Sequence, residues 1–310
     1  MFTGNWRNQE VKNCGVAVKA KNLVGVSNPL RAWPRRLYYG IKNRPDVQIK
    51  RLERRIEVLE SCLVSSAGQV DGWREIHSLL QPWKVLDLTL TRFGAIGDGG
   101  YLLPIKFVGS AKGAVSIGVG TEISADRELV SRGVPVHAWD HTVTELPEKG
   151  TGVVFHPLGL GEDPLNDLLA PLSEIVNLSF GSGLGDLILM LDCEGAEWET
   201  LMPSNLETLK RFSIISAELH FLGNGLVDSV PFLDSLRFMN EYFLAVSTSS
   251  NNYSATWSVE GITLPDYIEI TWVNRKHLPE SEISGAFTGA FKGAITGNRN
   301  CPDIEPLGDF

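Results

Sequence analysis

The sequence is poor in cysteine and has no long apolar run. Its four cysteines are far apart and form neither a CxxC pair nor a Cys/His ligand pattern, which argues against a disulfide framework or a zinc site and favours free thiols in a reducing cytosol. The longest compact apolar run, Leu187–Leu191, is too short to span a bilayer. The first stretch also lacks the apolar segment of a secretory signal. We therefore expect a soluble, cytoplasmic protein without a transmembrane segment.

Acidic residues are scarce at the start of the chain and abundant after it. Residues 1–55 contain 13 Lys and Arg residues against Glu10, Asp46 and Glu53, a net charge of +10, so the rest carries −19 of the total of −9. An acidic body repels a polyanion along its approach path, and we therefore expect no nucleic-acid partner. The basic segment suits an acidic partner, a membrane surface, the protein's own acidic body, or a solvated extension.

The pattern along the chain predicts three parts. Residues 1–85 form a basic N-terminal extension, 86–275 form the catalytic domain, and 276–310 form a tail to which we assign no chemistry. Within the extension, apolar residues three and four apart predict an amphipathic helix over 49–63. That helix either docks on the neighbouring domain or forms a homodimer contact. A second short helix is expected over Trp73–Leu80.

From residue 86 onward, short β-rich runs alternate with helical stretches, which predicts an α/β fold with parallel strands joined by crossover helices. The last two strands are expected to be an antiparallel pair joined by a loop, because Ser250, Asn251, Asn252 and Gly261 lie between them. Helices are expected at about 123–132, 164–175, 196–209 and 228–241. The expected strands are Leu86–Phe93, Ala114–Ile117, Val134–Trp139, Gly152–His156, Leu187–Leu191, Ser213–Leu219, Phe243–Ser247 and Tyr267–Val273.

A glycine turn and a carboxylate predict a nucleoside cofactor. Gly118 and Gly120 follow a predicted strand and precede a helix, so the backbone can turn sharply and a ligand can approach the helix N-terminus. Asp140 ends the next strand, 22 residues after Gly118, where a carboxylate accepts hydrogen bonds from ribose hydroxyls. Glu122 is placed to meet an ammonium group, or alternatively to complement the dipole of the helix.

The third glycine of the dinucleotide fingerprint is missing, because Ile123 occupies its place. A pyrophosphate then lacks its usual close approach to the backbone. The pattern therefore disfavours NAD and favours S-adenosylmethionine, a nucleoside cofactor without phosphate.

Several motifs in order resemble those of FkbM-type methyltransferases. Arg92–Tyr101 resembles the segment R-x-G…D-G-G-Y, and Ser116–Gly120, Ala138–Thr142 and Leu189–Glu197 resemble the motifs that follow it. The resemblance implies a Rossmann-like class I methyltransferase fold, with a mostly parallel seven-stranded sheet and helices on both faces. It also implies S-adenosylmethionine as methyl donor and O-methylation of sugar or natural-product hydroxyls. By the same resemblance Asp98, Gly100, Tyr101 and Asp192 join the cofactor-binding residues.

Two positions depart from that pattern. Ser116 stands where many class I enzymes have an acidic residue, and Met190 stands where this family often has lysine. The first departure concerns the contacts to the aminoacyl end of the cofactor. It leaves the glycine turn and Asp140 in place.

Residues for the chemistry are expected at the carboxyl ends of the strands, where open α/β sheets bind ligands. Asp192 follows one strand, and Glu218 and His220 lie two residues apart on one face of the next. Two mechanisms are open. In one, His220 is the general base, oriented by Glu218 or Asp192; in the other, all three hold Mg²⁺ or another divalent cation, which acidifies the hydroxyl.

The leading hypothesis is an O-methyltransferase that acts on a sugar, a glycan or a glycosylated small molecule. A catalytically silent S-adenosylmethionine-binding scaffold is the first alternative, and a nicotinamide-dependent oxidoreductase is the second. Asp192, Glu218 and His220 together argue against the scaffold, because a scaffold has no need of them. A structural role for a buried Glu–His pair also remains open.

Overall fold

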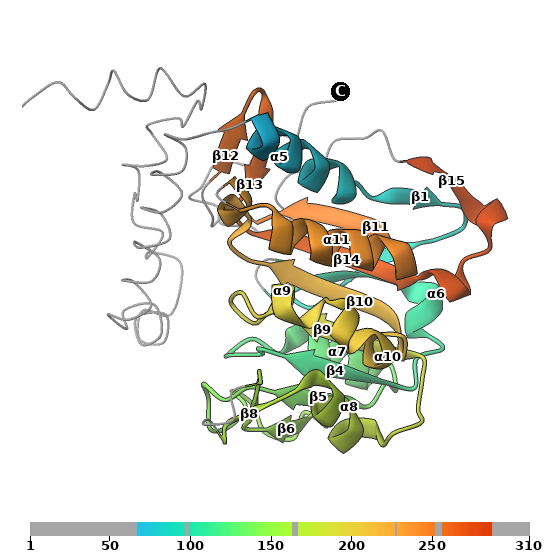
Figure 1. The fold of residues 1–310 in the computed structure, drawn as a ribbon. Helices are drawn as coiled ribbons and strands as arrows, with labels where there is room; N and C mark the ends of the chain where they lie inside the picture. The colour runs from blue at the N-terminus through green and yellow to red at the C-terminus, as the bar shows by residue number, and fades with distance from the viewer. Residues whose placement is uncertain (1–66, 97–98, 163–166, 227, 252–255, 287–310) are drawn as a thin grey trace, which may run out of the picture.

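The computed structural model describes residues 67–96, 99–162, 167–226, 228–251 and 256–286. A seven-stranded sheet runs through this part of the chain in the order β11-β14-β10-β9-β4-β5-β6 (Figure 1). Neighbouring strands are parallel except at β14, which is antiparallel to both β10 and β11. The strands are β4 (Gly113–Ile117), β5 (Val136–Trp139), β6 (Val154–His156), β9 (Leu187–Leu191), β10 (Phe212–Leu219), β11 (Phe243–Ser250) and β14 (Ile268–Asn274).

The strand order confirms the predicted fold class. A mostly parallel sheet with an antiparallel last pair, covered by helices on both faces, is the Rossmann-like class I methyltransferase fold that the sequence pattern predicts. The central strands are fully buried: all five residues of β9 and all eight of β10 are shielded from solvent. Burial along the whole length of a strand is typical of strands that are covered on both faces of the sheet.

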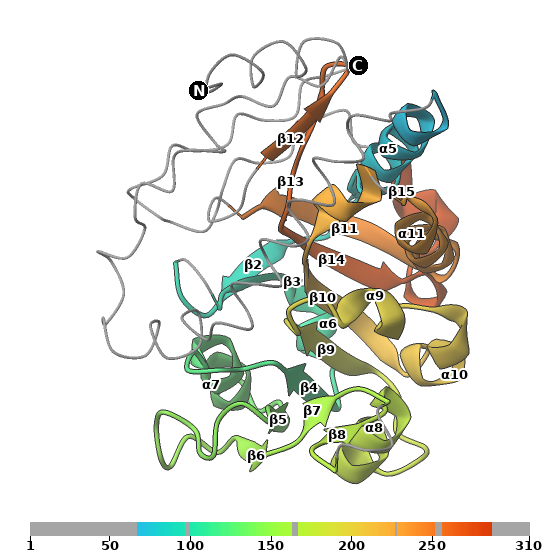
Figure 2. The ribbon, with the colours of Figure 1, turned by 60° about the vertical axis from the view of Figure 1, so that its left-hand side comes forward.

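Helices cover the sheet unequally (Figure 2). One face carries α5, α8, α9, α10 and α11, and the other carries α6, α7 and the hairpin of β2 and β3. The first set is α5 (Ala67–Leu79), α8 (Leu172–Phe180), α9 (Glu197–Thr200), α10 (Leu206–Leu209) and α11 (Val230–Tyr242). The second set is α6 (Ile105–Val108), α7 (Ser124–Ser131), β2 (Leu90–Phe93) and β3 (Tyr101–Pro104).

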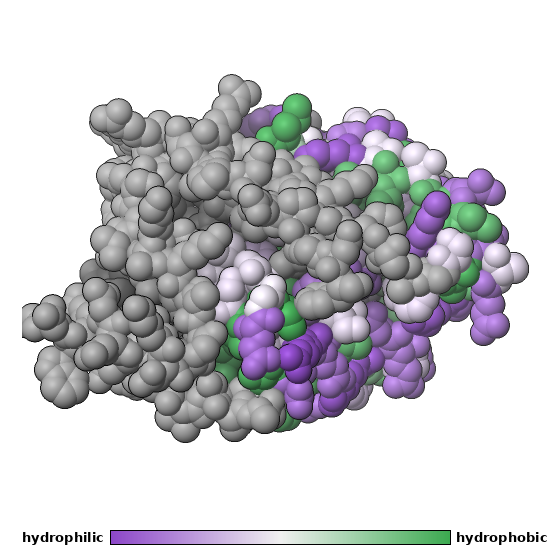
Figure 3. All heavy atoms as spheres, turned by 90° about the horizontal axis from the view of Figure 1, so that it is seen from above, coloured by the Kyte–Doolittle hydropathy of each residue, from purple (hydrophilic) through white to green (hydrophobic). Residues whose placement is uncertain are grey.

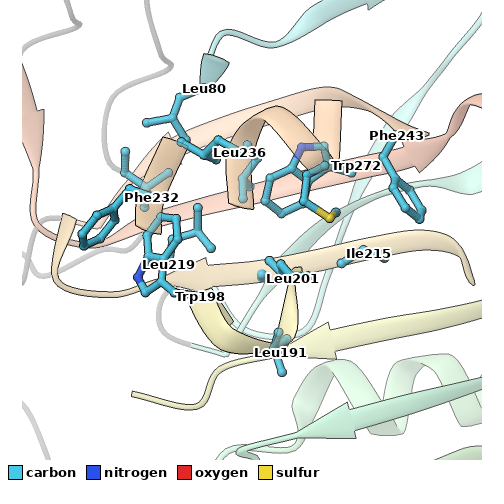
Figure 4. Close-up of a cluster of buried hydrophobic side chains, with 14 of the residues drawn as sticks. Leu80, Leu191, Trp198, Leu201, Ile215, Leu219, Phe232, Leu236, Phe243 and Trp272 are labelled. Atoms are coloured by element: carbon cyan, nitrogen blue, oxygen red, sulfur yellow. The ribbon is translucent and has the colours of Figure 1, made fainter. Parts of the chain in front are cut away.

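The larger core lies between the sheet and α11 (Figure 4). Phe232 and Leu236 of α11 face strand residues such as Leu219 and Trp272, and Leu80 reaches the same cluster from the end of α5. Trp272 and Leu80 are fully buried. Replacing a buried side chain of this size with Ala typically costs about 2–5 kcal/mol, so this cluster is a main source of stability.

The packed part of the chain is wider than the expected domain of 86–275. On its N-terminal side, α5 packs against α11. Beyond both ends, β1 (Trp83–Val85) pairs with β15 (Ile283–Ala286). Part of the segments expected to be extension and tail therefore belongs to the folded unit. The helix predicted over 49–63 lies outside the described residues.

Two predicted helices are placed differently. The helix expected at 164–175 begins only at Leu172, because Leu169–Ala170 form β8 and Pro171 is extended (φ −66°, ψ 154°). β8 pairs in parallel with β7 (Gly159–Leu160). The helix expected at 196–209 is broken into α9, a 3₁₀ turn over Pro203–Asn205, and α10. Pro203 explains the break, because proline has no backbone N–H to donate within a helix.

Two predicted β segments also differ. The strand expected over Leu86–Phe93 begins at Leu90, because Asp87 takes a left-handed turn conformation (φ 55°). That strand pairs with β3 outside the main sheet. The connection before the last strand is more than a loop: it contains a hairpin of β12 (Thr256–Val259) and β13 (Ile262–Pro265).

The described surface mixes hydrophilic and hydrophobic residues (Figure 3). Its exposed large apolar side chains come from separate segments, such as Leu86, Leu178 and Val230. Within the described ranges, no helix has the length and apolar content that crossing a membrane requires.

Candidate functional site

A cavity of about 300 Å³ opens at the carboxyl ends of β4, β5, β9 and β10. This is the edge of the sheet where the sequence analysis expects the ligand. Of the residues predicted for the site, Tyr101, Gly118, Gly120, Glu122, Asp140, Asp192, Glu218 and His220 line it. Gly100 is not among the lining residues; a Cβ there would meet the carbonyl oxygen of Ala95 and the guanidinium of Arg92. Asp98 lies outside the described residues.

The glycine turn sits directly against the strand that carries Asp192. Gly118 has φ 87°, and a Cβ there would lie 1.7 Å from the backbone oxygen of Asp192. Only glycine fits such an approach. Gly120 also has a positive φ of 50°, and no atom lies within 4 Å of the position its Cβ would take. The turn therefore leaves open space for a ligand before α7.

Asp140 is buried at the end of β5, and its carboxylate organises the cavity wall. Its Oδ2 accepts a hydrogen bond from the backbone N–H of Gly120 at 2.7 Å, and its Oδ1 accepts from the N–H and hydroxyl of Thr142, each at 2.6 Å. A carboxylate has about four acceptor positions. One position on Oδ2 is left for a ligand hydroxyl, as the predicted ribose contact requires.

Glu122 lines the cavity and also stabilises the start of α7. Its Oε1 accepts a hydrogen bond from the N–H of Ser124 at 2.7 Å. A Cβ on Gly99 would lie 2.1 Å from Cγ of Glu122, so Gly99 lets this side chain lie across the turn. The structure thus shows the helix-end role of Glu122 that the sequence analysis gave as its alternative.

Asp192, Glu218 and His220 come together as the sequence pattern predicts. The Nε2 atom of His220 lies 3.5 Å from Asp192 Oδ1 and 3.8 Å from Glu218 Oε2. One possible ligand atom from each of the three residues lies within 4.8 Å of the others. Carboxylate oxygens and an imidazole nitrogen at this separation form a donor set for a divalent cation.

Glu197 lies next to His220, although the sequence pattern predicts no role for it in the site. It does cap, since its carboxylate accepts from the backbone N–H groups of Cys193 and Gly195. It is also fully buried, and its Oε1 lies 3.3 Å from Nδ1 of His220. The feature of the sequence that could have indicated this position is Gly195, whose positive φ of 115° turns the chain just before Glu197.

The charge of His220 follows from this enclosure. Burial alone would lower the pKa of His220, but the adjacent carboxylates of Glu197, Glu218 and Asp192 together hold it well above its usual value. Glu197 and the pair Asp192 and Glu218 face opposite ring nitrogens. The arrangement therefore stabilises positive charge at Nε2, whether a proton or a bound cation carries it.

Asn251 and Tyr267 complete this side of the cavity, although the sequence pattern did not single them out. The side-chain amide of Asn251 donates to Oε1 of Glu218, and the ring of Tyr267 lies 4.7 Å from that of His220, centroid to centroid. Both residues border the connection between β11 and β14. That connection is distant from His220 in sequence, so only the antiparallel pairing of β14 with β10 brings them together.

Several carboxylates line the cavity, and no Lys or Arg is among the described residues that line it. Burial raises the pKa of Tyr101 far above its usual range, and the charges of Asp192, Glu218, Asp126 and Glu269 raise it further. The site is therefore suited to a cationic ligand and unsuited to a pyrophosphate. The acidic residues of the wall are Glu122, Asp126, Asp140, Asp192, Glu194 and Glu218.

Comparisons with known proteins add little to this geometry. No protein-family profile matches the chain, and no curated protein matches it in sequence. Among solved structures, a "putative RNA methyltransferase" from Pyrococcus horikoshii aligns with 66% of this chain and 98% of its own, at 10% identity and a TM-score of 0.28. The strand order defines the fold, and the contacts described above define the site.

Proposed function

We propose that this chain is an S-adenosylmethionine-dependent methyltransferase. One observation carries the proposal: the glycine turn and Asp140 adjoin a wall that is rich in carboxylates and has no Lys or Arg among its described residues. S-adenosylmethionine has a ribose for Asp140, and its ammonium and sulfonium groups are positive. A nicotinamide dinucleotide would bring a pyrophosphate to the same wall, against like charge.

The position of the missing third glycine supports this choice of cofactor. Ile123 is buried and packs with Val119 and Ala138, so its backbone is not open to a pyrophosphate at the start of α7. When bound, S-adenosylmethionine would supply a methyl group on a sulfonium: a nucleophile of the acceptor attacks the methyl carbon, the C–S bond breaks, and S-adenosylhomocysteine leaves as a neutral thioether. The residues of the chain then have to align the acceptor, exclude water and take a proton.

We further propose that the acceptor is a hydroxyl of a sugar, a glycan or a glycosylated small molecule, as the FkbM-type motifs imply. A hydroxyl is a weak nucleophile, so its proton has to be removed. Asp192, Glu218 and His220 lie at the cavity and provide either a base or the ligands for Mg²⁺ or another divalent cation. The base would be His220, and the ligands of the cation would be all three residues.

Calorimetric titration tests the cofactor first. We expect S-adenosylmethionine and S-adenosylhomocysteine to bind and NAD and NADP not to bind. Binding of NAD but not S-adenosylmethionine would establish the oxidoreductase alternative. Binding of S-adenosylmethionine with no transfer to any acceptor would favour the silent scaffold.

A methyl-transfer screen over sugars and glycosylated metabolites, with and without Mg²⁺, tests the acceptor. Structured RNA serves as the acceptor expected to fail, because residues 56–310 are strongly acidic. If a cation is held, EDTA abolishes turnover, Mg²⁺ or Mn²⁺ restores it, and Asp192→Asn is as damaging as Glu218→Gln. If His220 acts as a base, activity survives EDTA, and an ionisation in the pH–rate profile disappears in His220→Asn.

The matched control is Glu199→Gln, which changes an exposed carboxylate on α9 and should keep full activity. In the proposed site, Glu218→Gln and His220→Asn should lower turnover while affinity for S-adenosylmethionine stays nearly unchanged, because they act on the acceptor. Full activity of the double variant would leave the Glu–His pair a structural role only.

A further inference from the structure

Asp126 is a buried carboxylate at the cavity that the mechanism above does not use. It lies in the first turn of α7, only 3% exposed, and it lines the cavity. Its neighbours Ala125 and Leu129 pack in the smaller core against the sheet, which fixes the helix. The carboxylate therefore has little freedom to reach solvent.

One oxygen of this carboxylate has no hydrogen-bond partner. Oδ1 of Asp126 is fully buried and makes no hydrogen bond within the described part of the chain. The hydroxyl of Ser116 and the N–H of Asp126 itself lower the pKa of this carboxyl group, against the larger effect of its burial. A buried acceptor without a donor destabilises the folded protein, so an orphaned oxygen at a ligand cavity points to a donor that the ligand supplies.

An ammonium group of a bound ligand would supply that donor and would also offset the negative charge of the carboxylate, since no Lys or Arg is among the described residues of the wall. Glu122, the residue first assigned to an ammonium group, already uses Oε1 to hold the N–H of Ser124. Asp126 is adjacent to Ser116, which stands where many class I enzymes have an acidic residue. Ser116 lies on β4, and Asp126 brings a carboxylate to the same place from α7.

We propose that Asp126 binds the ammonium group of the aminoacyl end of S-adenosylmethionine, and so supplies from α7 the carboxylate that position 116 lacks. This inference rests on the proposed function, since it requires that cofactor. It assigns the two ends of the cofactor to different carboxylates. Asp140 holds the ribose, and Asp126 discriminates ligands that carry an ammonium group from those that lack one.

Paired ligands test the assignment by calorimetry. S-adenosylhomocysteine carries the aminoacyl end, whereas 5′-methylthioadenosine has the same nucleoside without it. Asp126→Asn keeps the size of the side chain and removes its charge. We expect the variant to bind S-adenosylhomocysteine about tenfold more weakly or worse, as lost charge-assisted hydrogen bonds imply, and to bind 5′-methylthioadenosine with unchanged affinity.

Two control variants test whether the loss of affinity is specific to Asp126. Asp234→Asn removes an exposed carboxylate from α11 and should change neither affinity. Asp140→Asn should weaken both ligands together, because both contain the ribose. Unchanged affinity of Asp126→Asn for S-adenosylhomocysteine would overturn the inference, and so would an equal loss for both ligands, which indicates a structural role.

Failure of the proposed function gives a different result, because the wild-type protein would then bind neither nucleoside. If Asp126→Asn does not fold, the wild type is titrated with S-adenosylhomocysteine and with its deaminated analogue. A clear preference for the ligand with the ammonium group supports the inference, and equal affinity for the two overturns it.

Discussion

At the scale of single residues, the carboxylates of the site differ in how many of their oxygen atoms accept hydrogen bonds from the chain. Asp140 accepts three hydrogen bonds from its own chain, and Glu197 holds two backbone N–H groups beneath His220. Asp126, in contrast, has one oxygen without a donor among the described residues. The first two therefore build the site, and the third is available to a ligand.

Asp140→Ala tests the ribose contact. The variant should bind S-adenosylmethionine about 1.5–3 kcal/mol more weakly, the usual loss for hydrogen bonds to a charged group. Calorimetric titration measures the change. Thr142→Val is the matched control, because it removes one donor to Asp140 and keeps the carboxylate. Unchanged affinity in a folded Asp140→Ala protein would contradict the assignment.

Asp126 should also make the stability of the ligand-free protein depend on pH. Burial first, and Glu122 in addition, raise the pKa of Asp126 from 3.8 to about 6. Between these two values the folded protein binds more protons than the unfolded chain does, so the free energy of unfolding falls as the pH rises. The free energy of unfolding lost across this window is about 3 kcal/mol, because each tenfold change in proton affinity corresponds to about 1.4 kcal/mol.

Urea unfolding at several pH values, without cofactor, measures this dependence. The difference between wild type and Asp126→Asn isolates it from the other carboxylates. We expect the wild type to lose stability relative to the variant from about pH 4 to about pH 6, as burial of the carboxylate implies. A constant difference over that range would show that the pKa of Asp126 is not raised.

At the scale of elements, the helices and strands that could be predicted from the sequence are those whose apolar pattern is not interrupted by proline. The apolar run of β9 and the mostly apolar segments of β4 and β10 mark buried strands. Parallel strands bring their carboxyl ends to one edge of the sheet, which is why Asp192, Glu218 and His220 could be grouped in advance. Segments that contain proline were less predictable. Around Pro171 and Pro203 the local pattern is helical, but the missing N–H decides where the helix begins or ends.

The missed parts of the site share a physical cause. Asp126 reads as an ordinary first-turn acid of a helix, and Glu197 as an ordinary cap. Their functional positions depend on what packs against them: Ser116 for Asp126 and His220 for Glu197. Contacts of this kind arise from the packing of α7 and α9 on the sheet, and spacing along one element does not encode them.

Helix α5 provides a prediction at the same scale. Trp73 is fully buried, and its indole N–H donates to the carbonyl oxygen of Ile262 in β13. Trp73→Ala should lower the free energy of unfolding by about 3–5 kcal/mol, measured by urea titration. The ion pairs that its neighbour Arg74 makes with described residues are exposed, so Arg74→Ala should lower the free energy of unfolding by at most about 1 kcal/mol. If both variants changed the free energy of unfolding by a similarly small amount, α5 would contribute little to the stability of the fold.

At the scale of the whole molecule, the position of α5 and β1 decides where the chain can be shortened. Removal of residues 1–46 should leave affinity for S-adenosylmethionine intact, because every described residue of the site lies after them. Removal of residues 1–85 should instead reduce stability, since it takes away Trp73, Ile76 and Leu80 from the larger core. Calorimetry and thermal unfolding of the two shortened proteins check both outcomes.

A folded protein without residues 1–46 that does not bind S-adenosylmethionine would place part of the site in the basic segment. A protein without residues 1–85 that is as stable as the full chain would restore the domain boundary expected at residue 86. The two deletions therefore separate a contribution to the site from a contribution to the core.

The contact between Gly118 and Asp192 has a consequence for how this site varies over evolution. The glycine turn at Gly118 and the backbone of Asp192, at the end of β9, are in contact without room for a Cβ between them. A substitution at position 118 would displace both partners at once, so no gradual series of side chains connects one cofactor turn to another here. Any residue other than glycine at position 118 therefore requires the backbone at Asp192 to move as well.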